Sequence, residues 1–375
     1  MQALPSISVL MPVYNAERFV EKAIRSVLNQ TFKDFELVIV NDGSRDRSVE
    51  IIEAFDDSRI RLVHNEQNMG LARVRNRLLE LARAPYIAWL DSDDYSEATR
   101  LRVQFDYLEN NSSAVLCGGF VRPFDHDSGR SGRVWQYPTD PQETKVRLLF
   151  DDPLATSAVM VRRNVFVDHK IEFRLEYPPA EDYDVWERVA QHGDILNLNR
   201  VLTHYRIHAN QSSTAGRDRE IESVRKIQER QLNRFGIVAS GEEREVHLKF
   251  GLNDYSLEYI DAAAFSGSRE SSEGVRSPGA FEDAAETWLE RLLAHNEDCG
   301  FYQKTAFRAV IADRWYRVCY ARWKTGWWAF RRYRASPLAA INGARRPALA
   351  PFVARCAFAA ARRFMTKPGP WSGTV

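Results

Sequence analysis

Residues 86 to 94 read YIAWLDSDD, a short apolar run that stops abruptly at three carboxylates. The aromatic and β-branched side chains of residues 86–90 predict a buried strand. The acidic run Asp91 to Asp94 predicts that the chain leaves the interior there. This stretch therefore predicts a strand with an acidic cluster at its carboxyl end.

The same strand pattern recurs on both sides of this stretch and alternates with helical patterns. Further strands are predicted at residues 7–13, 35–40, 60–63 and 114–121, with helices at 16–30, 47–55, 71–82 and 97–109. Residues 35–40 (FELVIV) are almost continuously apolar, as in a central strand covered on both faces. The alternation predicts an α/β fold, with a Rossmann-like, mostly parallel sheet flanked by helices.

Polar segments follow three of these strands, where ligands of such sheets bind. Tyr14 and Asn15 follow the first strand, and Asp42 follows the second. An aromatic ring there can stack on a base, and a carboxylate can accept a hydrogen bond from a base N–H. Taken alone, Asn15 suits equally the N-cap of a helix from Ala16, and residues 42–44 suit a simple turn.

The acidic run suits a divalent cation. Asp91 and Asp93 are separated by one residue, so both carboxylates can reach one ion beyond the sheet edge, and Mg²⁺ and Mn²⁺ prefer such oxygen ligands. An acidic turn that merely ends the strand is the alternative, and we expect Asp94 to cap the following turn. Arg75 stands early in the helical pattern at 71–82, which precedes the acidic run, and a guanidinium at the start of a helix suits phosphate.

Four segments in order and spacing resemble glycosyltransferase family 2. They are residues 7–15 (ISVLMPVYN), 40–44 (VNDGS), 68–76 (NMGLARVRN) and 90–94 (LDSDD). The resemblance extends over residues 5–210. It implies the GT-A fold, a nucleoside-diphosphate-sugar donor, inversion at the anomeric carbon, and Mn²⁺ or Mg²⁺ held by the D-x-D motif.

The resemblance also assigns roles by position. Nucleotide-sugar contacts are expected at Pro12, Tyr14, Asn15, Asp42, Arg75, Asp91, Ser92 and Arg206, and metal contacts at Asp93, Asp91 and His208. Arg206 and His208 belong to the run YRIH, which resembles the segment that closes many catalytic domains of this family. His204, Arg206 and His208 alternate on a predicted strand at 201–207, and a structural role for them is the alternative. Uridine diphosphate is the expected nucleotide, with thymidine and guanosine left open.

A second acidic pair, Glu181 and Asp182, begins an amphipathic pattern downstream. Inversion in one displacement needs a base for the acceptor hydroxyl, which contributes roughly 10²- to 10⁴-fold. The segment resembles the Glu-Asp motif of the family, which implies that Asp182 is the base. We expect Glu181 to orient Asp182 or an acceptor hydroxyl. The alternative is that both only complement a helix dipole. Asp184 is a candidate for the acceptor cleft, whereas we expect Trp186 to pack in the helix.

Composition divides the chain into regions. We predict a catalytic domain at 1–215, with a nucleotide-sugar half at 1–121 and an acceptor half at 122–215. We predict three further regions: a helical extension at 216–265, a flexible linker at 266–280 and a basic, aromatic-rich helical region at 281–375.

The carboxyl-terminal region is strongly basic. Residues 301–375 contain fifteen Lys or Arg and one acidic residue, whereas the whole chain has a net charge of +1. We expect its aromatic-rich helix to pack on the protein, with peripheral contact to anionic lipid as the alternative. No nucleic-acid module is recognisable, so we expect no nucleic-acid partner.

The four scattered cysteines, Cys117, Cys299, Cys319 and Cys356, favour neither a disulfide framework nor a zinc site. No export signal is visible, and the apolar runs are shorter than the roughly 20 residues that span a bilayer. We therefore expect a cytoplasmic enzyme, peripheral on the inner face of the membrane, that glycosylates a cell-surface glycan or glycolipid. Transfer to a polyprenyl phosphate and a catalytically silent nucleotide-binding protein are the alternatives.

Overall fold

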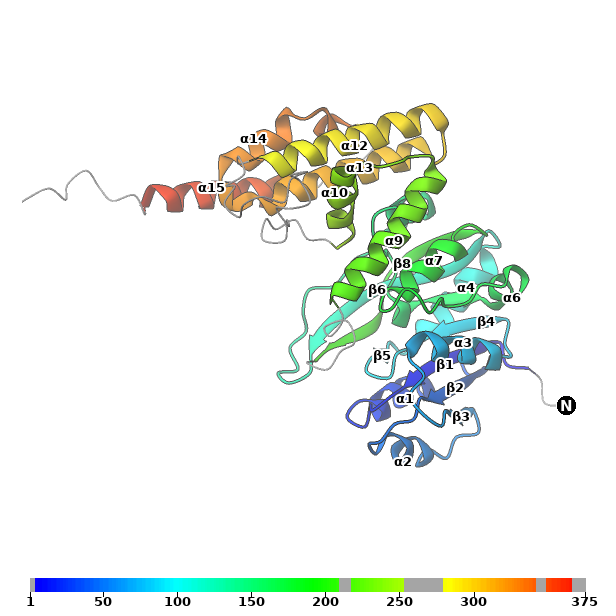
Figure 1. Cartoon of the computed structure of the whole chain (residues 1–375). Helices are drawn as coiled ribbons and strands as arrows, with labels where there is room; N and C mark the ends of the chain where they lie inside the picture. The colour runs from blue at the N-terminus through cyan, green and yellow to red at the C-terminus, as the bar shows by residue number, and fades with distance from the viewer. Residues whose placement is uncertain (1–3, 209–216, 253–278, 342–348, 366–375) are drawn as a thin grey trace, which may run out of the picture. The chain divides into compact units, whose positions relative to one another are not determined.

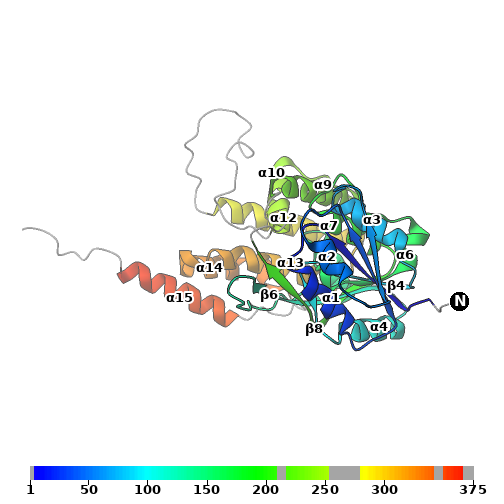
Figure 2. The ribbon, with the colours of Figure 1, turned by 90° about the horizontal axis from the view of Figure 1, so that it is seen from below.

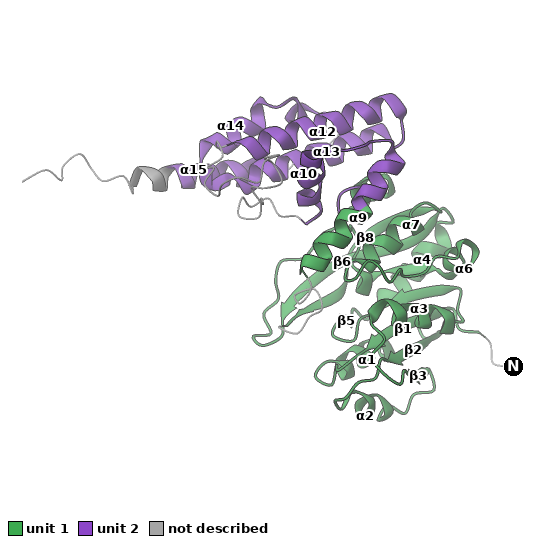
Figure 3. Cartoon of the chain, viewed as in Figure 1, with its two compact units in different colours: residues 1–148, 152–227 green, residues 149–151, 228–375 purple. Residues whose placement is uncertain are grey.

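The protein is represented by a computed structural model, which describes residues 4–208, 217–252, 279–341 and 349–365 (Figure 1). The chain forms two compact units (Figure 3). One contains residues 1–148 and 152–227, and the other contains residues 149–151 and 228–375. Helix α9 (Arg217–Phe235) contributes residues to both units.

An eight-stranded sheet in the order β3-β2-β1-β4-β7-β6-β8-β5 is the framework of the first unit. Its strands are β1 (Ile7–Val13), β2 (Phe35–Asn41), β3 (Ile60–His64), β4 (Tyr86–Trp89), β5 (Tyr95–Ser96), β6 (Ala114–Asp125), β7 (Met160–Arg162) and β8 (Asp194–Ile207). Strands β1 to β4 pair in parallel, as do β6 and β8. The short strands β5 and β7 are antiparallel to their neighbours. The predicted α/β fold with a mostly parallel sheet is confirmed.

Helices cover both faces of the parallel half of this sheet. They are α1 (Val20–Leu28), α2 (Ser48–Glu53), α3 (Leu71–Leu81) and α4 (Arg100–Asn110). Later in the chain come α5 (Pro141–Leu148), the 3₁₀ turn η1 (Thr156–Ala158), α6 (Arg163–His169) and α7 (Glu181–Val189). Figure 2 shows α3 on one side of the strands and α1 and α4 on the other. Every residue of β1 and β2 is buried as a result, as the continuous apolarity of β2 predicts.

The prediction that a helix begins at Ala16 with Asn15 as its cap is wrong. Helix α1 begins at Val20, and Asn15 has a φ of 49°, in the left-handed region that Asn tolerates better than most residues. Its side-chain oxygen accepts a hydrogen bond from Arg45 N at 2.9 Å, and its own N–H donates to Ser44 Oγ at 2.9 Å. Asn15 therefore holds the loop after β2, which local sequence could not reveal.

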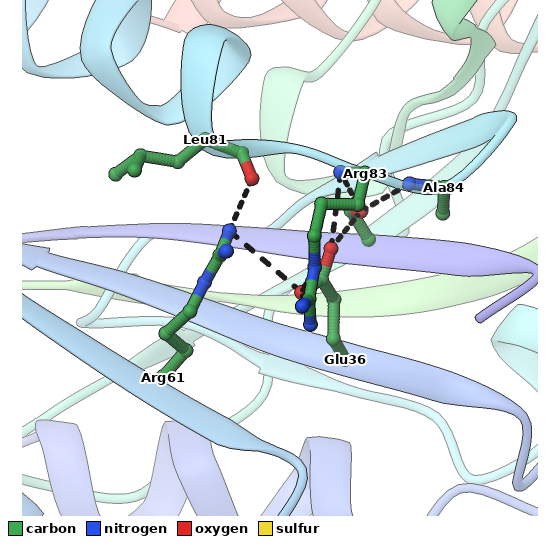
Figure 4. Close-up of polar contacts among 6 residues, drawn as sticks. Glu36, Arg61, Leu81, Arg83 and Ala84 are labelled. Atoms are coloured by element: carbon green, nitrogen blue, oxygen red, sulfur yellow. Dashed lines mark hydrogen bonds and ion pairs between the residues drawn. The ribbon is translucent and has the colours of Figure 1, made fainter. Parts of the chain in front are cut away.

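A buried carboxylate on β2 ties three segments of the sheet together (Figure 4). The Glu36 side chain is 5% exposed, and it accepts hydrogen bonds from Ser8 Oγ at 2.6 Å and from Arg83 Nη2 at 2.7 Å. Arg61 Nη2 lies 3.7 Å from the same carboxylate and also donates to Leu81 O. Burial would raise the pKa of Glu36, but the hydrogen bonds from Arg83 and Ser8 and the charge of Arg61 outweigh it, so the pKa is lowered.

Helices build the second unit. They are α10 (Gly241–Gly251), α12 (Ala280–Cys299), α13 (Lys304–Ala321), α14 (Trp327–Ala335) and α15 (Leu349–Met365), with 3₁₀ turns η3 (Trp323–Thr325) and η4 (Pro337–Ala340). Trp288 and Trp315 are buried in this unit. Arg314 is fully buried and pairs with Asp151 at 2.7 Å. Most of the predicted linker at 266–280 lies outside the described residues.

The four cysteines are free thiols, and Cys299 alone among them is exposed. None of the helices within the described residues is long and apolar enough to cross a membrane.

Candidate active site

A cavity of about 750 Å³ opens in the first unit, at the carboxyl ends of the parallel strands. The predicted site residues that line it are Pro12, Tyr14, Asn15, Asp42, Arg75, Asp91, Ser92, Asp93, Glu181, Asp182 and His208. They meet because β1 pairs with β2 on one side and with β4 on the other, so the ends of three strands stand together. Arg206 is the predicted site residue that does not line the cavity.

Tyr14 and Asp42 stand at the end of the cavity formed by β1 and β2. Tyr14 is 47% exposed, so its ring is available to a stacking partner. Asp42 is 3% exposed and accepts hydrogen bonds from Asn65 Nδ2 at 2.6 Å and from Gly70 N at 3.0 Å. Asp42 thus holds the loop that leads into α3, and its contact with a base stays a prediction.

Arg75 on α3 connects the two acidic pairs of the cavity. It is 4% exposed, and its Nη1 donates to Glu181 Oε1 at 3.1 Å while Nη2 lies 3.6 Å from Asp91 Oδ1. Burial would lower the pKa of Arg75, but the charges of Asp91, Glu181 and Asp182 raise it overall. The guanidinium is therefore a fixed cation between the end of β4 and the start of α7.

Both carboxylates that face Arg75 have a raised pKa. Burial raises the pKa of Asp91, Arg75 opposes the rise, and the charge of Asp93 adds to it. Burial also raises the pKa of Glu181, again against the opposing charge of Arg75 and with a contribution from Asp182. Asp91 Oδ2 accepts a further hydrogen bond from Ser157 Oγ at 2.9 Å. The cavity thus concentrates negative charge around one buried arginine.

The end of β8 closes on the acidic run from the other side. His208 Nε2 and Asp93 Oδ2 are 3.0 Å apart, and Arg206 Nε donates to Asp93 O at 2.7 Å. Asp94 is 1% exposed, and its Oδ1 accepts a hydrogen bond from Arg206 N at 2.9 Å. Asp94 therefore anchors the run to β8. The prediction that Asp94 caps the following turn is wrong. His204 contacts Glu97 Oε1 at 2.6 Å and does not line the cavity.

Burial raises the pKa of Asp94 well above the ordinary aspartate value, and the neighbouring charges of Asp93 and Asp91 raise it further. Asp91 and Asp93 keep side chains that are 30% exposed toward the cavity. These two carboxylates are the members of the run that a ligand can reach.

The donor set fits a hard divalent cation that is shared with a ligand. No group of three or more His, Cys, Asp or Glu side chains arranged to hold an ion occurs among the described residues. Mg²⁺ needs few protein ligands when phosphate oxygens and waters complete its shell, and Asp91 and Asp93 present such oxygens. A cation held by Asp93, Asp91 and His208 stays a prediction.

Asp182 lies in the first turn of α7 and lines the cavity. Its Oδ2 accepts a hydrogen bond from Thr156 Oγ1 at 3.1 Å, and Oδ1 accepts one from Tyr183 N at 2.9 Å. The carboxylate is thereby held in one orientation while it faces the cavity. These contacts suit a group that takes a proton from a bound hydroxyl.

The two other residues singled out on α7 point into the protein. Trp186 is fully buried, which confirms the prediction that it packs in the helix. Asp184 is also fully buried and accepts a hydrogen bond from Arg188 Nη2 at 2.6 Å. The prediction that Asp184 lines the acceptor cleft is wrong, because this face of the helix turns toward the interior.

Several lining residues had no signal in the sequence. Thr156 and Ser157 on η1 position Asp182 and Asp91, and Trp135, Tyr137 and Glu220 also line the cavity. None belongs to a charged or glycine-rich motif. The pairing of β6 with β7 and with β8 brings segments that are distant in the sequence to one cavity.

Comparisons with known proteins identify relatives of this chain. The sequence model of the family described as Glycosyl transferase family 2 matches residues 8–169. An uncharacterized glycosyltransferase of Haemophilus influenzae is 30% identical over 250 residues, which are 63% of this chain and 77% of that protein. The Escherichia coli protein WfgD, named as a UDP-Glc:alpha-D-GlcNAc-diphosphoundecaprenol beta-1,3-glucosyltransferase, is 29% identical over 203 residues, or 54% of this chain and 77% of WfgD.

A solved structure shows the same fold. Residues 1–349 of S. aureus TarS in complex with UDP-GlcNAc superpose with a TM-score of 0.52 at 18% sequence identity, covering 89% of this chain and 90% of that one. At 18% sequence identity, this similarity is evidence for the fold alone.

Proposed function

Because the chain belongs to glycosyltransferase family 2, we propose that it is an inverting, metal-dependent glycosyltransferase. It transfers a sugar from a nucleoside-diphosphate donor to a hydroxyl of a cell-surface glycan or lipid-linked acceptor in a single displacement. We take the donor to be a UDP-sugar, since WfgD is named for UDP-Glc and TarS was solved with UDP-GlcNAc.

The buried Arg75 carries this proposal. It pairs with Asp91 on the donor side and with Glu181 on the acceptor side, so a single guanidinium links the two halves of the cavity. A displacement needs a leaving diphosphate and an incoming hydroxyl on opposite sides of one carbon. Fixed positive charge between them suits a reaction in which negative charge grows on the leaving group.

In this mechanism the residues of the cavity divide the work. Tyr14 stacks on the base. Asp93, Asp91 and His208 would hold a divalent cation, which would supply positive charge to the leaving diphosphate. Asp182, oriented by Thr156, takes the proton of the acceptor hydroxyl as that oxygen attacks the anomeric carbon.

The test is incubation of the full chain with a panel of nucleotide sugars and Mn²⁺, with calorimetric titration of the nucleoside diphosphates. Asp93→Ala should abolish metal-dependent nucleotide binding. Asp182→Asn should leave donor binding intact and lower kcat by about 10²- to 10⁴-fold, the contribution of one general base. Asp127→Asn is the matched control, because Asp127 is exposed and does not line the cavity.

Two results would change the assignment. If no donor in the panel is hydrolysed and no nucleotide binds, the enzyme proposal is defeated. That outcome would favour a catalytically silent protein. Full activity of Asp182→Asn would instead favour a polyprenyl-phosphate acceptor, because an ionised phosphate needs no base to attack.

We further propose that the enzyme works at the cytoplasmic face of a membrane, in peripheral contact through its second unit. Many arginines there are paired with acids, as Arg332 is with Asp283 at 2.7 Å and Arg308 with Glu297 at 2.7 Å. In η3, α14 and the described side chains of α15, the exposed cations without a carboxylate partner are Lys324, Arg331, Arg334 and Arg355.

Exposed aromatic side chains occur on the same helices as these cations. Trp327 is 41% exposed, Trp328 is 38% exposed and Phe358 is 58% exposed. Trp327, Arg331 and Arg334 recur at helical spacing on one face of α14. Interfacial aromatics together with unpaired basic residues suit an anionic lipid surface.

Co-sedimentation with vesicles tests this contact. The full chain should bind vesicles that contain phosphatidylglycerol more strongly than vesicles of phosphatidylcholine, and less at high salt. Arg331→Glu with Arg334→Glu should abolish the binding. The control, Lys33→Glu with Arg200→Glu, makes the same change of charge at exposed sites of the first unit. Equal binding of both double variants would refute the assignment to α14.

A further inference from the structure

Aromatic side chains line the acceptor side of the cavity. Trp135, Tyr137 and Tyr205 all line it, together with the proposed base Asp182. The rings of Trp135 and Tyr205 have centroids 5.1 Å apart at an interplanar angle of 46°. Trp135 is nevertheless 41% exposed, so its packing against Tyr205 leaves much of the indole uncovered.

The backbone of Trp135 is held on β6. Trp135 forms an isolated antiparallel bridge with Val121 on β6. The backbone N–H of Trp135 donates to Val121 O at 2.8 Å, and Val121 N donates to Trp135 O at 3.2 Å. Tyr205 lies on β8, which pairs with β6 along its length. The fixed backbone and the ring contact with Tyr205 reduce the freedom that the indole has left to lose when it receives a ligand.

The charges around this wall are negative. Glu181 and Asp182 line the cavity on the acceptor side, and so does Glu220 at the start of α9. The described cations in the lining are Arg18 and Arg75, and Arg75 is paired with Asp91 and Glu181. A polyanionic acceptor is therefore disfavoured next to the aromatic wall, whereas hydroxyl groups find carboxylates to which they can donate hydrogen bonds.

A pyranose ring combines the two properties that this wall matches. Its axial C–H groups form an apolar face with slight positive charge, which suits the negative face of an aromatic ring. Its hydroxyls project around the rim and suit nearby carboxylates. A linear polyol phosphate has neither a flat apolar face nor neutral charge.

We propose that Trp135 and Tyr205 form a platform on which a neutral pyranose of the acceptor stacks, with the attacking hydroxyl toward Asp182. This inference deepens the proposed function and rests on it, because it names the class of acceptor that the same cavity takes. The enzyme therefore extends an acceptor that ends in an uncharged hexopyranose unit.

Calorimetric titration of the full chain tests the platform. The probes are p-nitrophenyl β-pyranosides of glucose, galactose, N-acetylglucosamine and N-acetylgalactosamine, and a poly(ribitol phosphate) fragment, each with and without UDP and Mn²⁺. At least one pyranoside should bind, and Trp135→Ala should weaken it by about 10- to 100-fold, the loss typical of a truncated aromatic anchor. Trp135→Phe should restore most of the affinity, because it keeps a stacking face. UDP binding should be unchanged in both variants.

Trp327→Ala is the matched control, because Trp327 is also 41% exposed but does not line the cavity. It should leave pyranoside binding unchanged. Three results would each overturn the platform. They are the absence of binding of any pyranoside, pyranoside binding by Trp135→Ala that equals that of the wild type, and binding of the poly(ribitol phosphate) fragment that is tighter than that of the pyranosides. Absence of UDP binding would instead count against the proposed function, and the titrations without UDP would still decide the platform.

Discussion

Replacing Glu36 by glutamine should destabilise the protein in a way that depends on pH. The substitution keeps the shape of the side chain and removes its charge. Glu36 is 5% exposed, and its carboxylate accepts hydrogen bonds from Ser8 Oγ and from three nitrogens of Arg83. These contacts hold β1, β2 and the segment before β4, the strands whose carboxyl ends form the cavity.

The size of the effect follows from the exposure of the partners. Removing one member of a fully buried ion pair costs about 3 to 5 kcal/mol, because the other member is left without compensation. The Arg83 side chain is 52% exposed and can be hydrated again, and the Arg61 side chain is 31% exposed. We therefore expect a loss of about 2 to 3 kcal/mol, close to the contribution of hydrogen bonds to one charged group.

The pH dependence has a definite sign. The pKa of Glu36 is lowered in the folded protein from its ordinary value of 4.5, so the charged form is stabilised by folding. Its contribution is fully present above the unfolded pKa and is lost as the pH falls through the folded pKa. The stability difference between wild type and Glu36→Gln should be constant above about pH 5.5 and should shrink below pH 4.5.

Urea unfolding at a series of pH values measures this difference. Glu21→Gln is the control, because the Glu21 and Arg25 side chains are 57% and 63% exposed, and it should change stability by about 0.5 kcal/mol or less. A loss at pH 7 no greater than that of the control would refute the role of Glu36. So would a loss that stays the same at pH 3.5.

Three further predictions concern the buried charges and the cation. Arg75→Gln should lower stability by about 3 to 5 kcal/mol in urea unfolding, because it leaves Glu181 and Asp91 desolvated without their cation; unchanged stability would show that the two acids are already neutral. Asp151→Asn should accelerate amide hydrogen exchange in α13, since Arg314 is fully buried and loses its partner at 2.7 Å; protection equal to wild type would contradict this. Chelation by EDTA should abolish UDP binding in calorimetry and Mn²⁺ should restore it, whereas binding that persists in EDTA would exclude the predicted cation site.

Much of the fold was readable from local sequence. The apolar run of β2 predicted a strand buried on both faces, and every residue of that strand is buried. Hydrophobic periodicity depends on residues a few positions apart, so it survives without tertiary information. Element ends were less accurate: β8 begins at Asp194 and α1 at Val20, because bulges and long-range hydrogen bonds set these limits.

The donor side of the cavity was also accessible from sequence. Tyr14, Asp42 and Asp91 each follow a predicted strand, and parallel strands place their carboxyl ends at one edge of the sheet. The Glu181 and Asp182 pair was found by resemblance to a family motif. Their roles in binding and catalysis stay predictions.

What the sequence determined by itself is therefore strands β1 to β4 and β6, the mostly parallel sheet that they form, and the acidic run at the end of β4. Only the tertiary structure decided which side chains complete the site: Ser157 beside Asp91, Thr156 beside Asp182, and Trp135 on the acceptor wall. Ser157 lies 66 positions from Asp91 along the chain. The physical reason is that secondary structure follows from interactions within a few residues, whereas a cavity is made by side chains that meet only after the strands have paired.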